Sequence, residues 1–156
     1  MSFGSYQEYL KKGKSVKLSD HYTLFDVCNS QEAIKHEIDN TPISPQIITN
    51  AGLVIKNILE PCCSHFMTRP DVSCIFRCPT LNNLLPGHSD TSQHLFGQAV
   101  DFTIVGTPLI LIVSYIRNHL NFDQLILESS WIHCSFSSAR NRKEVLKNAD
   151  GKYIAF

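Results

Sequence analysis

The sequence predicts an α+β domain in which an antiparallel sheet packs against one long helix and several shorter helices. Apolar residues follow helical periodicity in the first part of the chain, most clearly between residues 47 and 59. Short β-rich runs predominate after residue 74. Helices that precede most of the strands are typical of a fold in which the helices gather on an antiparallel sheet.

Capping residues mark the expected helices. Ser30 is a good N-cap for a short helix over residues 30–38. Thr41 followed by proline supplies a cap and a first-turn residue for the long helix, expected over residues 41–59. A second Thr-Pro pair begins a helix over residues 107–120.

Runs of β-branched and aromatic residues predict the strands. These are expected at residues 74–77, 100–104, 124–127, 131–136, 142–146 and 152–155. The last two are separated by Asn148-Ala-Asp-Gly151 and therefore predict a terminal hairpin, whereas the turn-rich segment 79–92 is expected to be a loop.

Length and composition predict a single globular domain. The chain has 156 residues, of which 43% are hydrophobic and 18% charged. We expect residues 1–16 to form a polar, loosely held N-terminal arm and residues 17–156 to form the domain. Fourteen basic and fourteen acidic residues cancel, which removes the electrostatic reason to expect nucleic acid as a partner. The pattern indicates no particular oligomeric state.

No targeting segment is expected. The first residues lack the basic and then apolar pattern of a signal peptide. The most apolar stretch, residues 108–116, is too short to insert across a bilayer. We therefore expect synthesis in the cytoplasm without Sec-dependent export and without membrane insertion.

Two histidines and an aspartate form a candidate metal site. His94 and Asp101 flank Gly97, which permits a tight turn between them, and His133 comes from a later strand. Two imidazoles and one carboxylate are the ligands of a catalytic Zn2+ ion, whose fourth position stays open for water. The same set could hold iron, cobalt or manganese. Strand alternation should direct Cys134 away from the metal.

The residues around these ligands extend the pattern to Ser92-x-His94-x-x-Gly97-x-Ala-x-Asp101 followed by Trp131-x-His133. This pattern resembles the zinc D-alanyl-D-alanine carboxypeptidase family, in its compact phage and bacterial branch. The resemblance covers residues 17–156 and includes Leu18-Ser-x-His21-x-Thr-Leu, Asp39-Asn40-x-Pro42, Leu59-Glu60-Pro61, Arg77, Asn82, Gly87 and Phe122-Asp-Gln-Leu.

The resemblance implies a hedgehog/DD-peptidase-like fold and a Zn2+ cofactor held by His94, Asp101 and His133. It also implies hydrolysis of peptide bonds in peptidoglycan stem peptides, often next to a D-amino acid. Arg77 matches a family arginine whose planar guanidinium can bind a substrate carboxylate or carbonyl. The alternative for Arg77 is a salt bridge that pins the loop. Ser92 either bonds the substrate or caps the loop.

The position of the general base departs from the family pattern. Many family members have an acidic residue three positions before the last histidine, where this chain has Ser130. Glu128, five positions before His133, is the acid that we assign as the base. A solvated turn carboxylate is the alternative role for Glu128, and Asp123 is a weaker candidate for the base.

These features predict a zinc peptidase of peptidoglycan, acting as a carboxypeptidase or an endopeptidase. Such an enzyme would serve as a phage endolysin released at lysis, or as a virion-associated wall hydrolase. A cytosolic dipeptidase is the enzymatic alternative. A catalytically silent zinc-binding module, which binds wall peptide or protein, is favoured only by Ser130. A structural virion protein is the third alternative.

Overall fold

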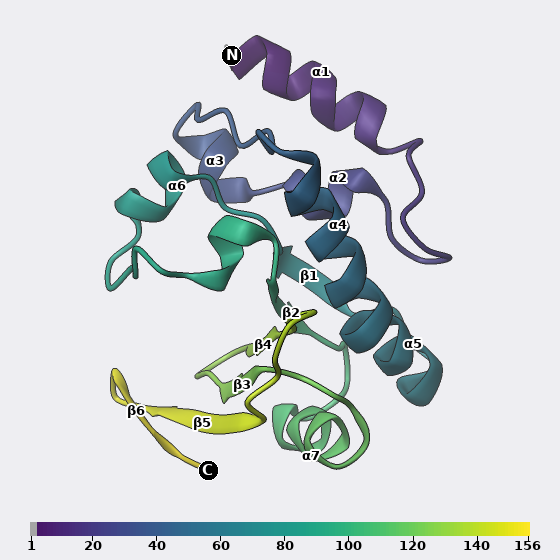
Figure 1. Ribbon diagram of the computed structural model, residues 1–156, viewed down its shortest axis with the longest axis vertical. Helices are drawn as coiled ribbons and strands as arrows, with labels where there is room; N and C mark the ends of the chain where they lie inside the picture. The colour runs from purple at the N-terminus through teal and green to yellow at the C-terminus, as the bar shows by residue number, and fades with distance from the viewer. Residues whose placement is uncertain (1–2) are drawn as a thin grey trace.

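The computed structural model describes residues 3–156, and Figure 1 shows their arrangement. The helices are α1 (Phe3–Gly13), α2 (Leu24–Cys28), α3 (Gln31–Lys35), α4 (Pro45–Val54), α5 (Glu60–Phe66), α6 (Pro79–Leu84) and α7 (Leu109–His119). A π-helical segment, η1 (Ile55–Leu59), joins α4 to α5, and η2 (Gln93–Phe96) is a 3-10 helix. The strands are β1 (Asp71–Cys74), β2 (Ala99–Thr103), β3 (Gln124–Leu127), β4 (Ile132–Ser135), β5 (Glu144–Ala149) and β6 (Lys152–Ala155).

The predicted α+β class is confirmed, with one difference in the sheet. The six strands lie in the order β1-β2-β4-β3-β5-β6, and β3 and β5 are parallel while all other neighbours are antiparallel. The chain leaves β4 beside the start of β3, where Lys143 donates to Phe122 O at 3.3 Å and Glu144 donates to Asp123 O at 3.0 Å. Because β5 begins at that end of β3, it runs in the same direction.

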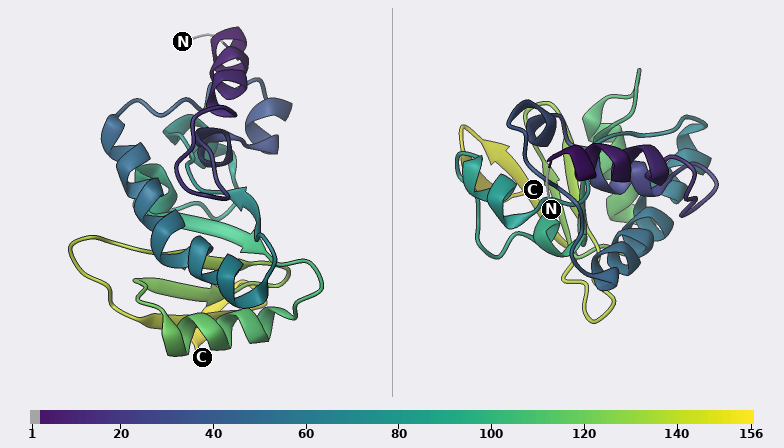
Figure 2. Two further views of the ribbon diagram at one scale, coloured as in Figure 1. Left: turned by 90° about the vertical axis from the view of Figure 1, so that its right-hand side faces the viewer. Right: turned by 90° about the horizontal axis from the view of Figure 1, so that it is seen from above.

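The two faces of the sheet differ in character. Alternate residues of β2 and β4, including Phe102 and Ile132, are fully buried in the hydrophobic core. Helices α4, α5 and α7 cover this face (Figure 2). The Tyr115 hydroxyl of α7 donates to Pro61 O of α5 at 3.2 Å. The residues that alternate with these buried ones along β2 and β4, such as Asp101 and His133, therefore point to the opposite face of the sheet, which is lined by loops.

The long helix begins later than the sequence predicts. Its N-cap is Ser44, whose side chain accepts from Gln46 N at 3.2 Å, and Pro45 occupies its first turn. The earlier Thr-Pro pair lies in a connection that is fixed by the buried Asn40. The Asn40 amide donates to Cys28 O and Phe76 O and accepts from Cys78 N. This connection holds residues 39–42 outside the helix.

Two predicted boundaries near residue 78 are wrong. The first strand ends at Cys74, because Phe76 N–H donates to Val27 O and Arg77 N–H donates to His94 O rather than to a strand. The segment 79–92, predicted as a loop, contains α6. Its N-cap is Cys78, whose sulfur accepts from Leu81 N at 3.5 Å, and a proline follows in the first turn.

The N-terminal segment also differs from the prediction of a loose arm. Helix α1 buries Tyr6 completely and Leu10 to 7% exposure. The Tyr6 hydroxyl donates to Cys28 O at 2.7 Å. Both side chains belong to the hydrophobic core, so this segment is packed against the domain. No helix within residues 3–156 has the length and apolar character needed to cross a membrane.

Replacing Gly97 should destabilise the protein much more than replacing Gly106. Both have positive φ, +66° and +74°, so either alanine is strained by about 1–2 kcal/mol. A Cβ at Gly97 would also lie 2.5 Å from Ile47 O, whereas a Cβ at Gly106 would meet nothing within 4 Å. We expect Gly97→Ala to lower the free energy of unfolding by about 3 kcal/mol or more. Chemical denaturation measures both, and equal losses would contradict the close-packing argument.

Candidate metal centre

Strand pairing places two of the three predicted ligands side by side. Asp101 on β2 lies directly opposite His133 on β4 in the antiparallel ladder. Directly opposite residues in such a pair project to the same face. The result is a contact of 2.9 Å between His133 Nδ1 and Asp101 Oδ1. On the other face of β4, Cys134 is fully buried in the core, as the alternation predicts.

The third residue, His94, comes from the 3-10 turn η2. Gly97 caps this turn with φ +66°, and the Asn50 amide of α4 donates to Phe96 O at 2.9 Å. These contacts bind the turn to helix α4 and direct the His94 ring toward β2. The ring is 2% exposed, so its position is fixed by packing as well as by hydrogen bonds.

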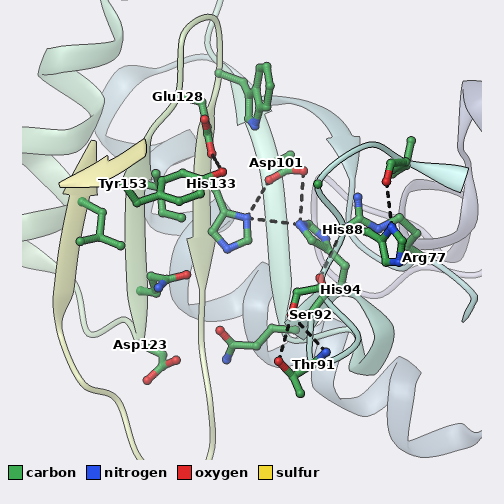
Figure 3. A pocket seen from close by; sticks show the side chains of 18 of the residues that line it. Arg77, His88, Thr91, Ser92, His94, Asp101, Asp123, Glu128, His133 and Tyr153 are labelled. Carbon is green, nitrogen blue, oxygen red and sulfur yellow. Dashed lines mark hydrogen bonds and ion pairs between the residues drawn. The ribbon is translucent and has the colours of Figure 1, made fainter. Parts of the chain in front are cut away.

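The potential ligand atoms of these three residues lie close together (Figure 3). His94 Nε2 lies 3.2 Å from Asp101 Oδ2 and 3.3 Å from His133 Nδ1. A tetrahedral Zn2+ ion with bonds of about 2.0–2.1 Å separates its ligand atoms by about 3.3 Å. The two separations from His94 Nε2 therefore fit the predicted Zn2+ cofactor, while the 2.9 Å contact of His133 Nδ1 is made with the other oxygen of Asp101, Oδ1.

Neighbouring groups orient the His94 ring. Its Nδ1 lies 3.0 Å from Ile75 O, which favours a proton on Nδ1 and leaves the Nε2 lone pair for a metal. Cys74 can also join a potential metal cluster with His94 and Asp101. Its sulfur, however, is 3.6 Å from Nδ1, on the side of the ring that faces Ile75. We therefore assign His133, rather than Cys74, as the third ligand.

The cluster is electrostatically coupled. Burial alone would lower the pKa of His94, but the negative charge of Asp101 and the neighbouring Cys74 raise it well above its usual value. Burial alone would raise the pKa of Asp101, but His94 and His133 lower it far below its usual range. Without a metal, this pair is therefore an imidazolium and a carboxylate at neutral pH.

An open pocket of about 760 Å³ lies in front of these residues. Arg77 and Ser92 line one wall, and the Arg77 guanidinium donates to Ser92 Oγ at 3.2 Å. Within residues 3–156, no carboxylate lies within ion-pair distance of Arg77, and its buried Nε has no hydrogen-bond partner. The loop-pinning salt bridge, one of the two alternatives, is therefore not formed by the described residues.

The two candidate bases lie in the same pocket but have different partners. Asp123 accepts from Arg142 Nε at 2.9 Å and from Arg142 Nη2 at 2.7 Å, and these bonds lower its pKa. Glu128 is 7% exposed, and among residues 3–156 its carboxylate accepts from Asn148 and Tyr153. The partners Arg142, Asn148 and Tyr153 come from the segment after β4. No spacing in the sequence predicts these partners.

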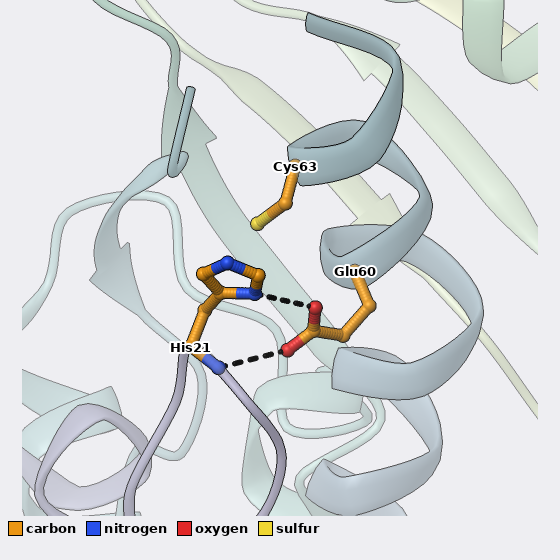
Figure 4. A group of neighbouring side chains, drawn as sticks. All are labelled: His21, Glu60 and Cys63. Atoms are coloured by element: carbon orange, nitrogen blue, oxygen red, sulfur yellow. Dashed lines mark hydrogen bonds and ion pairs between the residues drawn. The ribbon is translucent and has the colours of Figure 1, made fainter. Parts of the chain in front are cut away.

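A second group of possible ligands, His21, Glu60 and Cys63, lies away from this pocket (Figure 4). Both carboxylate oxygens of Glu60 already contact His21. Oε1 accepts a hydrogen bond from the backbone N–H of His21 at 3.2 Å, and Oε2 lies 2.7 Å from the ring nitrogen Nδ1. The Arg69 guanidinium lines the adjoining hollow and adds positive charge there. This group therefore ties the loop before α2 to α5.

Removing one ligand should greatly weaken zinc binding. We expect His133→Ala to lower zinc affinity by at least about a hundredfold, because only His94 and Asp101 remain. Competition with a chromophoric chelator measures this change. His36→Ala, at an exposed histidine beside Glu32, is the matched control and should bind zinc as the unchanged protein does. Unchanged affinity in His133→Ala would contradict the assignment.

Zinc binding should release a proton at neutral pH. The raised pKa of His94 means that its imidazole is protonated there without metal, whereas zinc requires the neutral ring. Affinity should therefore rise with pH until the solution passes the pKa of His94, and fall steadily in acid. Calorimetry in two buffers of different ionisation enthalpy counts the released protons. Release of no proton at pH 7 would contradict the coupling between His94 and Asp101.

Comparison with known proteins identifies the family. A family model described as Peptidase M15 matches residues 20–135, which is more than half of the chain and includes all three candidate ligand residues. No curated protein matches the sequence. The match confirms the resemblance drawn from the motif and agrees with the mixed α+β fold. The chain belongs to the peptidase M15 family, whose members are zinc peptidases of the D-alanyl-D-alanine carboxypeptidase type.

Proposed function

We propose that this protein is a zinc-dependent peptidase that hydrolyses peptide bonds in peptidoglycan stem peptides. The observation that carries the proposal is the convergence of His94, Asp101 and His133 on the floor of an open pocket. Three protein ligands leave a position for water, which is the arrangement of catalytic rather than structural zinc sites. We propose that it acts on the wall after lysis-type release or as a component of a virion.

The pocket walls supply the other groups that peptide hydrolysis needs. When bound, zinc acts as a Lewis acid and lowers the pKa of a coordinated water. Glu128 is the carboxylate that takes the proton from the attacking water and passes it to the leaving amine. Each of its oxygens accepts one hydrogen bond from the protein, so each retains a lone pair that can accept a proton.

Arg77 is suited to orient the substrate. Its buried Nε lacks a partner, and leaving a buried charged donor unpaired costs free energy. The side chain also lines the pocket, where its planar guanidinium suits a carboxylate of the stem peptide. Ser92 already accepts from Arg77 Nη2 and thereby fixes the direction of the guanidinium. Arg77 and Ser92 thus form the substrate-binding wall of the proposed site.

Mass spectrometry of purified peptidoglycan fragments tests the function directly. Tetrapeptide, pentapeptide and cross-linked stems are incubated with the zinc-loaded protein, and a chelator-treated sample is the control. Cleavage of a stem-peptide bond that occurs with zinc and is prevented by the chelator supports the proposal. The product masses then show whether the cleaved bond is terminal or internal. Intact fragments with stoichiometric zinc would instead favour the catalytically silent module.

Glu128→Gln should strongly reduce turnover while leaving zinc bound. Removing a general base lowers kcat by about 10²–10⁴-fold, and the amide keeps the size of the side chain. Glu8→Gln is the matched control, because Glu8 is exposed on α1. The measurements are kcat on the cleaved stem and zinc content. Full activity in Glu128→Gln would show that Glu128 is not the base.

A further inference from the structure

The Glu128 carboxylate is held by the C-terminal hairpin. Glu128 directly follows β3, and its backbone N–H donates to Trp131 O at 3.1 Å. Its Oε2 accepts from Asn148 Nδ2 at 2.7 Å. Its Oε1 accepts from the Tyr153 hydroxyl at 3.1 Å, the bond drawn in Figure 3. Within residues 3–156, no cationic side chain lies within ion-pair distance of this carboxylate. Two neutral donors therefore fix a nearly buried carboxylate.

Strand register explains why these three side chains meet. Leu127 pairs with Lys147 in the parallel β3–β5 ladder, so Glu128 and Asn148 are the next residues along. Asn148 lies directly opposite Tyr153 in the antiparallel β5–β6 pair. Opposite residues share a face, and this face is the one that carries the pocket. Glu128, Asn148 and Tyr153 thus form a row across three neighbouring strands.

The hairpin turn locks the Asn148 amide in one orientation. Gly151 N–H donates to Asn148 Oδ1 at 2.8 Å, so Nδ2 must be the group that faces Glu128. The turn residues Asp150 and Gly151 have φ of 52° and 83°, as a tight two-residue hairpin with primed-turn geometry requires. The position of the carboxylate is therefore coupled to the shape of the turn.

Tyr153 serves as a donor rather than as part of the core. Its ring is 55% exposed, yet its hydroxyl is directed to Glu128. Partial burial and the charge of Glu128 raise the pKa of Tyr153, so the hydroxyl keeps its proton through the neutral range. Removing this hydroxyl should leave the fold intact, because the ring contributes little to the hydrophobic core.

We propose that Tyr153 and Asn148 are positioning residues for the reaction, and that hairpin β5–β6 completes the active site by aiming the Glu128 carboxylate. This inference rests on the proposed function. A base must lie within hydrogen-bond reach of the proton that it takes, and a carboxylate free to change rotamer would spend much of its time elsewhere. The hairpin lies outside residues 20–135, so the family match does not cover these two residues.

Two substitutions test the positioning role. Tyr153→Phe removes only the hydroxyl. Asn148→Asp keeps an oxygen for the Gly151 N–H but replaces the donor to Glu128 by a repelling carboxylate. On a stem peptide that the unchanged protein cleaves, we expect kcat to fall about tenfold in Tyr153→Phe, the equivalent of one lost hydrogen bond, and further in Asn148→Asp. KM and zinc content should stay within about twofold in both variants.

The matched control is Tyr115→Phe. The Tyr115 hydroxyl also donates one hydrogen bond, to Pro61 O at 3.2 Å, but lies on the helix-covered face of the sheet. Its loss should leave kcat unchanged. Thermal denaturation of each variant shows whether the fold is retained. If both pocket variants match the unchanged protein in kcat, the inference is overturned while the proposed function stands.

A double-mutant cycle separates positioning from a structural role. In a Glu128→Gln background, Tyr153→Phe should cause no further loss of residual activity, because the base that it positions has been removed. An equal loss in both backgrounds would overturn the inference. Cleavage of no stem peptide by the unchanged, zinc-loaded protein would contradict the proposed function, and with it the inference.

Discussion

The antiparallel pairing of β2 with β4 is the constraint on which the site depends. It places Asp101 opposite His133 with a contact of 2.9 Å, on the face that the helices leave open. A shift of one residue in this register would turn one of the two side chains into the core and bring Val100 or Cys134 to the pocket in its place. The fully buried Phe102 and Ile132 on the other face fix the register, so the hydrophobic core determines the geometry of the metal centre.

His94 is held by a different constraint, the close packing of its turn against helix α4. The Asn50 amide bonds Phe96 O, and the turn passes Ile47 so closely that only glycine fits at position 97. The turn therefore brings a third ligand to a pair that the sheet has already formed. In the absence of metal, the charge of Asp101 compensates for the burial of the His94 imidazolium.

Much of this arrangement could be predicted from the sequence, because local signals carry it. The spacing around His94, Asp101 and His133 predicts a cluster that the structure brings together, and β3 lies at the residues that its β-rich run predicts. Competing signals caused the errors: Thr41 and Ser44 are both good caps followed by proline, and the buried Asn40 decides between them. The parallel β3–β5 pairing has no local signature.

That pairing also gives the two candidate bases different partners. Asp123 and Glu128 lie at opposite ends of β3 and both line the pocket. The segment that leads into β5 brings Arg142 to Asp123, where the ion pair lowers the pKa of the Asp123 carboxyl and opposes its protonation. The far end of the same strand brings only the neutral Asn148 and Tyr153 to Glu128. Two carboxylates in one pocket thus have different surroundings, and such a difference is the pattern by which acids and bases are assigned in active sites, which favours Glu128 as the proposed base.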